Sequence, residues 1–311
     1  MVHTDKIKNI AIFGATGHIA KNLIYEFSKH TKHKLFLFSR DKTKVKKFVA
    51  AMCIDKNINY NDYENIHLGS FDVIINCVGI SNPLEITKHG KEILILSEKY
   101  DEIIIEYIKK NTACQYLNFS SGVIYGDFSQ PVSDESFSNI SLNDSSNAYT
   151  LAKIRSETKH RLLSSFNIID IRMFSFFSRF IDLNTSFFIS EIITSINNNK
   201  EFLTNTQNFF RDFIHPDDLF QLICLCIEKP KSNFALDAYS KSPISKYDIL
   251  KEFNNHFNLK YFFNDDLKIK QPTGFKEKYY SVSRKAKNIG YLPTYSSLET
   301  ILSESQFLII K

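Results

Sequence analysis

The chain has 311 residues and a formal net charge of +5, from 39 Lys and Arg against 34 Asp and Glu. Hydrophobic residues make up 43% and charged residues 23%, which excludes a disordered chain, a collagen and a coiled coil. That length suits one large domain or two lobes, and no basic run is dense enough to predict a nucleic-acid partner.

No segment has the roughly 18 consecutive apolar residues of a membrane-spanning helix, and residues 1–10 lack the apolar core of a signal peptide. The five cysteines are odd in number and show no metal-ligand spacing, which predicts reduced thiols and no metal site. We therefore expect a cytoplasmic protein with no membrane partner.

In chain order, the first part alternates between apolar and amphipathic segments. Strands are expected at 8–14, 34–38, 71–79, 114–121 and 166–174, and helices at 17–30, 41–52, 85–109 and 146–165. Strands that are apolar almost throughout are typical of parallel strands covered by helices on both faces. The pattern predicts the α/β class, with a Rossmann-type doubly wound parallel sheet.

The alternation weakens after about residue 175. Helices are expected at 185–199, 216–228, 245–257 and 296–306, with a short strand near 233–239. We interpret residues 1–175 as the first domain. Residues 176–311 then form mainly a smaller C-terminal lobe, with some strands returning to the first domain.

A glycine-containing turn joins the first strand to the first helix. Gly14 permits a tight turn, Gly17 permits close approach of a pyrophosphate, and Ala20 is small enough for the helix to pack on the strand. A helix N-terminus in this place offers free N–H groups to phosphates. The context predicts a dinucleotide-binding loop, in which Thr16, His18 and Ile19 are further cofactor-binding candidates; for His18, a solvent-facing role is the alternative.

The end of the second strand bears on which dinucleotide binds. NAD sites usually place Asp or Glu there, against the ribose hydroxyls. This chain has Ser39 followed by Arg40, and an arginine can pair with the 2′-phosphate of NADP. We expect NADP(H) to be preferred, while the adjacent Asp41 keeps NAD(H) possible.

Tyr149 and Lys153 are four residues apart in the helix expected at 146–165, so they share one helical face. A nearby ammonium group favours the phenolate form of a tyrosine, which can then exchange a proton with a substrate oxygen. Ser121 lies at the end of the strand at 114–121, at the sheet edge where ligands of such folds bind. A turn or helix cap is the alternative for the serine.

Together these motifs resemble the extended short-chain dehydrogenase/reductase superfamily, in its nucleotide-sugar epimerase, dehydratase and reductase branch. The resemblance rests on the segments 14–20, 76–79, 120–126, 149–153 and 211–218. It implies that Ser121 orients the substrate hydroxyl, that Tyr149 is the acid/base and that Lys153 binds the nicotinamide ribose and tunes Tyr149. It also implies that Cys77, Val78 and Gly79 line the cofactor, that residues 1–175 bind the dinucleotide and that the smaller lobe binds substrate.

Departures from the branch narrow the chemistry. Its 4,6-dehydratases carry an Asp-Glu pair after the catalytic hydroxyl residue, where this chain has Gly122 and Val123. Elimination of water is therefore not expected. Simple redox and epimerisation remain, and Ser39-Arg40 favours a reductase that exchanges NADPH.

The resemblance also suggests substrate-binding residues. They are Ser121, Gly122, Ser175, which replaces the usual Asn, Arg179 and Arg211, which matches a position that contacts a nucleotide diphosphate. For Arg211 an ion pair with a nearby Asp is an equal alternative. Relatives often pair through two helices of the first domain, so a homodimer is expected.

The expected activity is therefore NAD(P)-dependent interconversion of a keto and a hydroxyl group on a nucleotide-linked sugar, at the 4-position. The alternatives are a nucleotide-sugar epimerase with tightly bound NAD and a non-catalytic dinucleotide-binding sensor.

Overall fold

The computed structural model describes residues 6–54, 58–80, 83–133, 140, 147–229, 231–267 and 274–310. Within these ranges, no helix combines the length and the apolar character that crossing a membrane requires.

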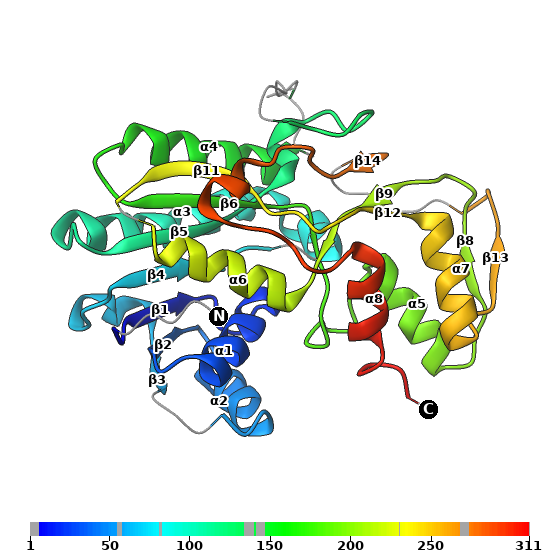
Figure 1. Ribbon diagram of the computed structural model, residues 1–311, viewed down its shortest axis with the longest axis horizontal. Helices are drawn as coiled ribbons and strands as arrows, with labels where there is room; N and C mark the ends of the chain where they lie inside the picture. Colours follow the sequence, from blue (N-terminus) through cyan, green and yellow to red (C-terminus); the bar gives the residue numbers. More distant parts are fainter. Residues whose placement is uncertain are drawn as a thin grey trace.

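A seven-stranded parallel sheet forms the centre of the fold (Figure 1). Its order is β11-β6-β5-β4-β1-β2-β3. The strands are β1 Asn9–Phe13, β2 Lys34–Phe38, β3 Ile58–Asn61, β4 Val73–Asn76, β5 Gln115–Ser121, β6 Ile168–Met173 and β11 Asn233–Asp237. The predicted doubly wound fold is thus confirmed. The strand order reverses between β1 and β4, and a ligand crevice is expected beyond the carboxyl ends of these two strands.

Helices cover both faces of this sheet because its strands are apolar on both faces. Ile10 and Ile12 pack in one core with Ile24 of α1, whereas Ala11 packs in a second core with Ile104 of α3. The helices of the first face are α1 His18–His30, α2 Lys42–Ala51 and α6 Pro216–Ile227; α3 Pro83–Lys110 and α4 Ala148–Leu162 pack against each other on the second (Figure 1).

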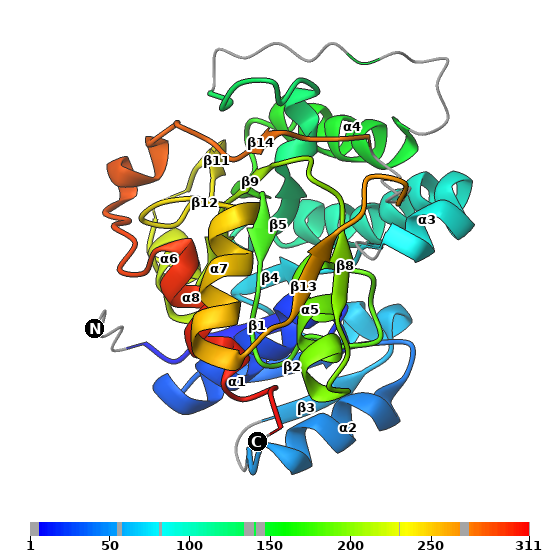
Figure 2. The same cartoon turned by 90° about the vertical axis from the view of Figure 1, so that its right-hand side faces the viewer.

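The C-terminal lobe lies at one end of the sheet, with its helices packed around a third apolar core (Figures 1 and 2). Its helices are α5 Phe188–Asn197, α7 Lys246–Phe257 and α8 Ser297–Ser305. Its short strands are β7 Ser175–Phe176, β8 Phe202–Thr204, β9 Phe210–Arg211, β10 Phe213–Ile214, β12 Ile244–Ser245, β13 Tyr261–Phe263 and β14 Lys278–Tyr279. Because β11 pairs with β6, the chain returns to the first sheet after entering this lobe.

The elements differ from the expected ones chiefly at their ends. The strand expected at 71–79 ends at Asn76, because the Asn76 side chain accepts a hydrogen bond from the Val78 N–H and turns the backbone out of the sheet. Residue 146, the expected start of α4, lies outside the described residues, and α4 ends at Leu162. The short helices η1 Tyr63–Leu68, η2 Gly122–Tyr125 and η4 Lys285–Ile289 complete the order.

Candidate functional site: a dinucleotide cradle beside a Ser-Tyr-Lys group

The loop after β1 lies very close to the chain that follows β4. Gly14 has a φ of +75°, and a Cβ there would lie 2.9 to 3.0 Å from backbone atoms of Cys77 and Val78. At Gly17 a Cβ would lie 3.2 Å from the carbonyl oxygen of Gly14. The geometry therefore requires glycine at position 14, whereas a side chain at position 17 would need a shift of a few tenths of an ångström.

No side chain caps the N-terminus of α1 at Gly17, so the first N–H groups of that helix stay available to an anion. Thr16 is exposed beside them. Ile19 is half-buried and packs on the core below the loop.

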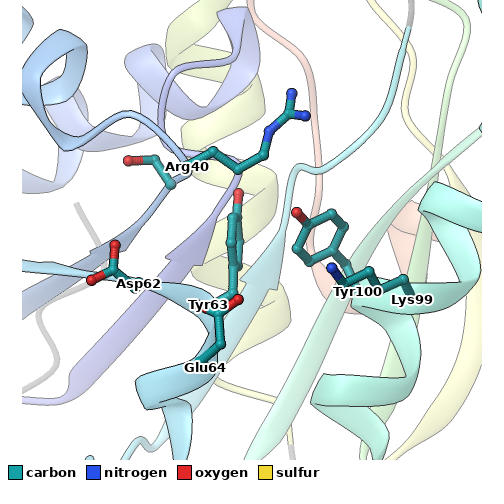
Figure 3. A pocket seen from close by; sticks show the side chains of 7 residues that line it. Arg40, Asp62, Tyr63, Glu64, Lys99 and Tyr100 are labelled. Carbon is teal, nitrogen blue, oxygen red and sulfur yellow. The ribbon is translucent and has the colours of Figure 1, made fainter.

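A pocket of about 280 Å³ lies beyond the ends of β2 and β3 (Figure 3). Its lining residues are Ser39, Arg40, Asp62, Tyr63, Glu64, Lys99 and Tyr100. Tyr63 accepts a hydrogen bond from the Gly14 N–H, which joins this pocket to the glycine loop. Ser39 is 2% exposed, and its hydroxyl has no hydrogen-bond partner in the described structure. A buried hydroxyl without a partner is costly, and a ligand hydroxyl or phosphate would satisfy it.

Arg40 is exposed at the rim of this pocket, and Asp41 is already engaged. The Asp41 carboxylate caps α2 by accepting a hydrogen bond from the Lys44 N–H at 3.0 Å. The Asp41 carboxylate, expected as a possible ribose ligand, therefore serves at least as the N-cap of α2.

Three features of the chain suit a dinucleotide. The crowded glycines, the uncapped N-terminus of α1 and the unsatisfied Ser39 hydroxyl lie along one path from the glycine loop to the pocket. The residues present therefore fit the pyrophosphate and the adenosine half of such a cofactor.

The segment that follows β4 lies beside the glycine loop, at the expected ligand crevice. Cys77 and Val78 are half-buried and Gly79 is exposed. Burial raises the pKa of the Cys77 thiol, although the charge of Lys153 acts in the opposite direction. Cys77 is therefore a neutral thiol near the ammonium group of Lys153.

His18 has a partner outside the loop. Its Nε2 lies 2.8 Å from the hydroxyl of Ser178, which also accepts a hydrogen bond from Asn22. Burial, with a smaller effect from Lys21, lowers the pKa of His18 to about 3. The imidazole is therefore neutral, and the structure directs it toward the C-terminal lobe.

Ser121, Tyr149 and Lys153 meet at the carboxyl end of β5. Ser121 is the last residue of β5 and caps η2, and its oxygen accepts a hydrogen bond from the Val123 N–H. The Lys153 ammonium lies 5.9 Å from the centre of the Tyr149 ring and donates to the carbonyl oxygen of Phe119 at 2.7 Å. Lys153 is thus fixed beneath Tyr149.

A second tyrosine completes this group, and sequence reasoning missed it. The hydroxyl of Tyr279, in β14, lies 3.1 Å from the Ser121 hydroxyl. The two residues are 158 positions apart, and no motif marks Tyr279 in the sequence.

Arg211 lies on the other side of Tyr279, 5.7 Å from the centre of its ring. Its guanidinium donates to the carbonyl oxygens of Phe210 and Lys276, and within the described ranges it forms no ion pair with a carboxylate. Burial lowers the pKa of Arg211 to about 10. The structure therefore does not support the alternative of an ion pair with a nearby Asp.

The aspartates close to Arg211 in sequence have other partners. Asp212 accepts from the Ser240 N–H, and Asp218 accepts from two backbone N–H groups after η4. Burial and the charge of Arg211 lower the pKa of Lys276 to about 8, so a second cation lies near the first. This cationic pair is suited to an anionic ligand.

The structure gives different roles to the remaining residues predicted to bind substrate. A Cβ at Gly122 would lie 2.3 Å from the Phe174 ring, so Gly122 serves packing at this site. Ser175 is half-buried in β7, which pairs with β10. The structure does not bring Arg179 to this group, because its guanidinium pairs with the buried Glu304 and lies over Phe307. Among the described residues, no cluster of His, Cys, Asp and Glu could hold a metal ion.

Solved structures with this fold include nucleotide-sugar enzymes. A UDP-glucuronic acid 4-epimerase from Bacillus cereus, in complex with UDP-glucuronic acid and NAD, has a TM-score of 0.81 and 17% identity over 96% of this chain and 98% of its own. A UDP-N-acetylglucosamine 4-epimerase from Methanobrevibacter ruminantium, in complex with UDP-N-acetylmuramic acid, has a TM-score of 0.80 and 14% identity over 97% and 98%.

A dTDP-glucose 4,6-dehydratase from Bacillus anthracis, in complex with NAD, has a TM-score of 0.76 and 14% identity over 96% of both chains. No curated protein sequence matches this chain. At these identities the structures establish a shared fold.

The family assignment comes from the sequence itself. A family model described as "NAD dependent epimerase/dehydratase family" matches residues 10–240, about three quarters of the chain. The match contains the glycine loop, the Ser-Tyr-Lys group and Arg211. It confirms the predicted resemblance and the prediction of an enzyme of this type. With fold, cradle and sequence in agreement, this chain belongs to the NAD dependent epimerase/dehydratase family.

Proposed function

We propose that this protein is an NAD(P)-dependent oxidoreductase that interconverts a keto and a hydroxyl group on a nucleotide-linked sugar, at the 4-position. The observation that carries the proposal is the grouping of Ser121, Tyr149 and Lys153 near the carboxyl end of β5. Lys153 bonds to Phe119 of that strand and lies against Tyr149, and Tyr149 packs on the apolar cluster that contains Tyr279, whose hydroxyl contacts Ser121. The solved neighbours in complex with UDP-sugars or NAD support the choice of substrate class.

When bound, the dinucleotide supplies or takes up the hydride at the sugar carbon. Tyr149 gives a proton to the carbonyl oxygen, or takes one from the hydroxyl in the reverse direction. Ser121 donates a hydrogen bond to the same oxygen and holds it beside Tyr149. The ammonium of Lys153 stabilises negative charge on the Tyr149 oxygen while it exchanges the proton.

Arg211 is the residue we assign to the diphosphate of the substrate. A half-buried guanidinium with no carboxylate partner among the described residues gains most from a doubly charged ligand, because arginine binds phosphate oxygens in a fork geometry. This assignment places the sugar between Arg211 and Tyr149.

NADP(H) is the cofactor we propose to be preferred. Arg40 is exposed at the pocket and Lys99 also lines it. Of the two carboxylates in the same lining, Asp62 is paired with Lys42, so Arg40 and Lys99 face the carboxylate of Glu64 alone and support the binding of a 2′-phosphate. Arg40→Ala should reduce the preference for NADPH over NADH about tenfold, or about 1.4 kcal/mol. Lys47→Ala, which removes an equal charge from the exposed side of α2, is the matched control. An unchanged preference in Arg40→Ala would contradict the assignment.

An epimerase with tightly bound NAD is the second candidate, favoured by the NAD-bound 4-epimerase among the solved neighbours. The two activities differ in cofactor turnover, because an epimerase consumes no net NAD(P)H. The purified protein would be denatured to identify any released dinucleotide, then assayed with a panel of nucleotide sugars. Stoichiometric NADPH oxidation supports the reductase. A sugar product without net oxidation supports the epimerase, and tight binding without turnover supports a sensor.

We further propose a cytoplasmic homodimer that pairs through α3 and α4. The five cysteines are free thiols, as suits a reducing compartment, and Ile95 of α3 is 68% exposed. Light scattering at micromolar concentration should give the mass of two chains. The mass of one chain would contradict the proposed dimer.

A further inference from the structure

Tyr279 reaches the catalytic group from the other part of the molecule. It belongs to β14 of the C-terminal lobe, while its hydroxyl lies 3.1 Å from Ser121 at the end of β5. The ring packs edge-on against Phe128, with 4.8 Å between centres, and at a tilt against Phe174, with 5.2 Å between centres. Its side chain is therefore buried, with aromatic rings and the cations of Arg211 and Lys276 around the ring and with its hydroxyl directed at Ser121.

The backbone around Tyr279 is held on two sides. On one side β14 pairs with β9, with Tyr279 opposite Arg211. On the other, the Lys278 N–H donates to Phe128 and the Val132 N–H donates to Tyr280. A phenol fixed in this way keeps its hydroxyl at one place relative to Ser121, which is what a positioning group requires.

Either hydroxyl can donate in the contact between Tyr279 and Ser121, and Ser121 keeps its own hydrogen for a ligand only when Tyr279 is the donor. Burial raises the pKa of Tyr279, so its phenol stays protonated and has a hydrogen to donate. The Ser121 oxygen has two lone pairs, and one of them accepts from the Val123 N–H at 3.4 Å. If Tyr279 donates to the second lone pair, both lone pairs of Ser121 are occupied. Ser121 can then form one more hydrogen bond, in which it donates its own hydrogen.

We infer that Tyr279 is a positioning residue of the proposed reaction: its hydroxyl donates to the Ser121 oxygen and thereby turns the Ser121 hydrogen toward the reacting oxygen of the substrate. The inference rests on the proposed function. No proton leaves Tyr279 during the reaction, and Tyr149 alone exchanges one with the substrate.

The experiment is a double-mutant cycle measured as kcat and KM for the nucleotide sugar. Tyr279→Phe keeps the ring and removes the hydroxyl, so kcat should fall about tenfold while KM stays within about twofold. In a Ser121→Ala background the same change should have less than about a twofold effect on kcat, because the partner of the hydroxyl is gone. Tyr280→Phe, at the next residue, should leave kcat unchanged and is the matched control.

Two outcomes would overturn the inference. One is an unchanged kcat in Tyr279→Phe. The other is an equal loss in both backgrounds, which would mean that Tyr279 acts on the substrate without Ser121. A merely structural role predicts a lower unfolding temperature and a higher KM in Tyr279→Phe, with kcat retained.

A crystal structure tests the inference separately from the proposed function. The two hydroxyl oxygens must lie within about 3.5 Å of each other, since a longer distance is no hydrogen bond. A longer distance overturns the inference even if the enzyme is active. A wild-type protein that turns over no nucleotide sugar, with the hydrogen bond present, overturns the proposed function.

Discussion

The close contact between the glycine loop and the chain after β4 lets us predict how much stability Gly14→Ala should lose. The new Cβ would stand in the left-handed region, which costs roughly 1–2 kcal/mol. It would also lie 2.9 to 3.0 Å from Cys77 and Val78 backbone atoms, and such overpacking costs roughly 1–3 kcal/mol. The expected loss in the free energy of unfolding is the sum, roughly 2–5 kcal/mol.

The crowded atoms cannot move away cheaply, because hydrogen bonds hold them. The Cys77 N–H donates to Phe13 at 3.0 Å, and the Val78 N–H donates to Asn76 at 3.0 Å. The clash in Gly14→Ala should therefore persist, and the distorted loop should bind NADPH at least tenfold more weakly, about 1.4 kcal/mol.

Two other glycines separate the contributions. Gly274 has the same φ of +75°, but a Cβ there would meet no described atom within 4 Å, so Gly274→Ala should cost only roughly 1–2 kcal/mol. Gly79 has neither a positive φ nor a close neighbour among the described residues, so Gly79→Ala should change stability by about 0.5 kcal/mol or less. Urea unfolding of the three variants measures these values. A Gly14→Ala loss no larger than that of Gly274→Ala would refute the argument.

Two further predictions concern charge. At His160, burial opposes protonation, but the carboxylates of Asp170 and Asp101, at 2.9 and 2.8 Å, outweigh it and raise the pKa to about 9. Because the pKa in the folded state lies above the ordinary 6.5, this stabilisation is complete below about pH 6.5 and is lost as pH rises through about 9. Urea midpoints should therefore fall between pH 6.5 and 9.5, and His160→Gln should flatten that fall; an equally steep fall in the variant would contradict the assignment. Arg211→Met should weaken binding of the free nucleoside diphosphate about 10- to 100-fold in calorimetry, as expected for loss of a charged hydrogen bond, and leave NADPH binding unchanged; an equal affinity for the diphosphate would remove Arg211 from the substrate site.

Most of the sheet could be predicted from the sequence because its strands are apolar on both faces. β1, β2, β5 and β6 lie within one or two residues of the expected ends. β3 was missed, because its sequence INYN carries two asparagines and only half-buried apolar side chains at the sheet edge. The two-residue strands of the C-terminal lobe are too short to leave a periodic signal.

The parts of the candidate site whose residues lie close together in the sequence could be predicted. The glycine loop and the pair of Tyr149 and Lys153 each lie within a few residues of one another in the sequence. Tyr279 was not predictable, because tertiary contacts bring it to Ser121 from 158 positions away: the pairing of β14 with β9 and the backbone hydrogen bonds to Phe128 and Val132. For Arg179 the sequence prediction was wrong. Its position in the sequence suggested a substrate-binding cation, but its guanidinium pairs with the buried Glu304 of α8 and lies away from the Ser-Tyr-Lys group.

The central claim is that Tyr149 exchanges the proton while hydride passes between the dinucleotide and a nucleotide-linked sugar. A single-turnover measurement tests it most directly: native enzyme and Tyr149→Phe, each with NADPH and a nucleotide-linked 4-keto sugar, followed by loss of the reduced cofactor's absorbance. We predict stoichiometric oxidation by the native enzyme and a rate at least about 100-fold lower in Tyr149→Phe, with NADPH binding retained. Oxidation at a comparable rate in Tyr149→Phe would contradict the account.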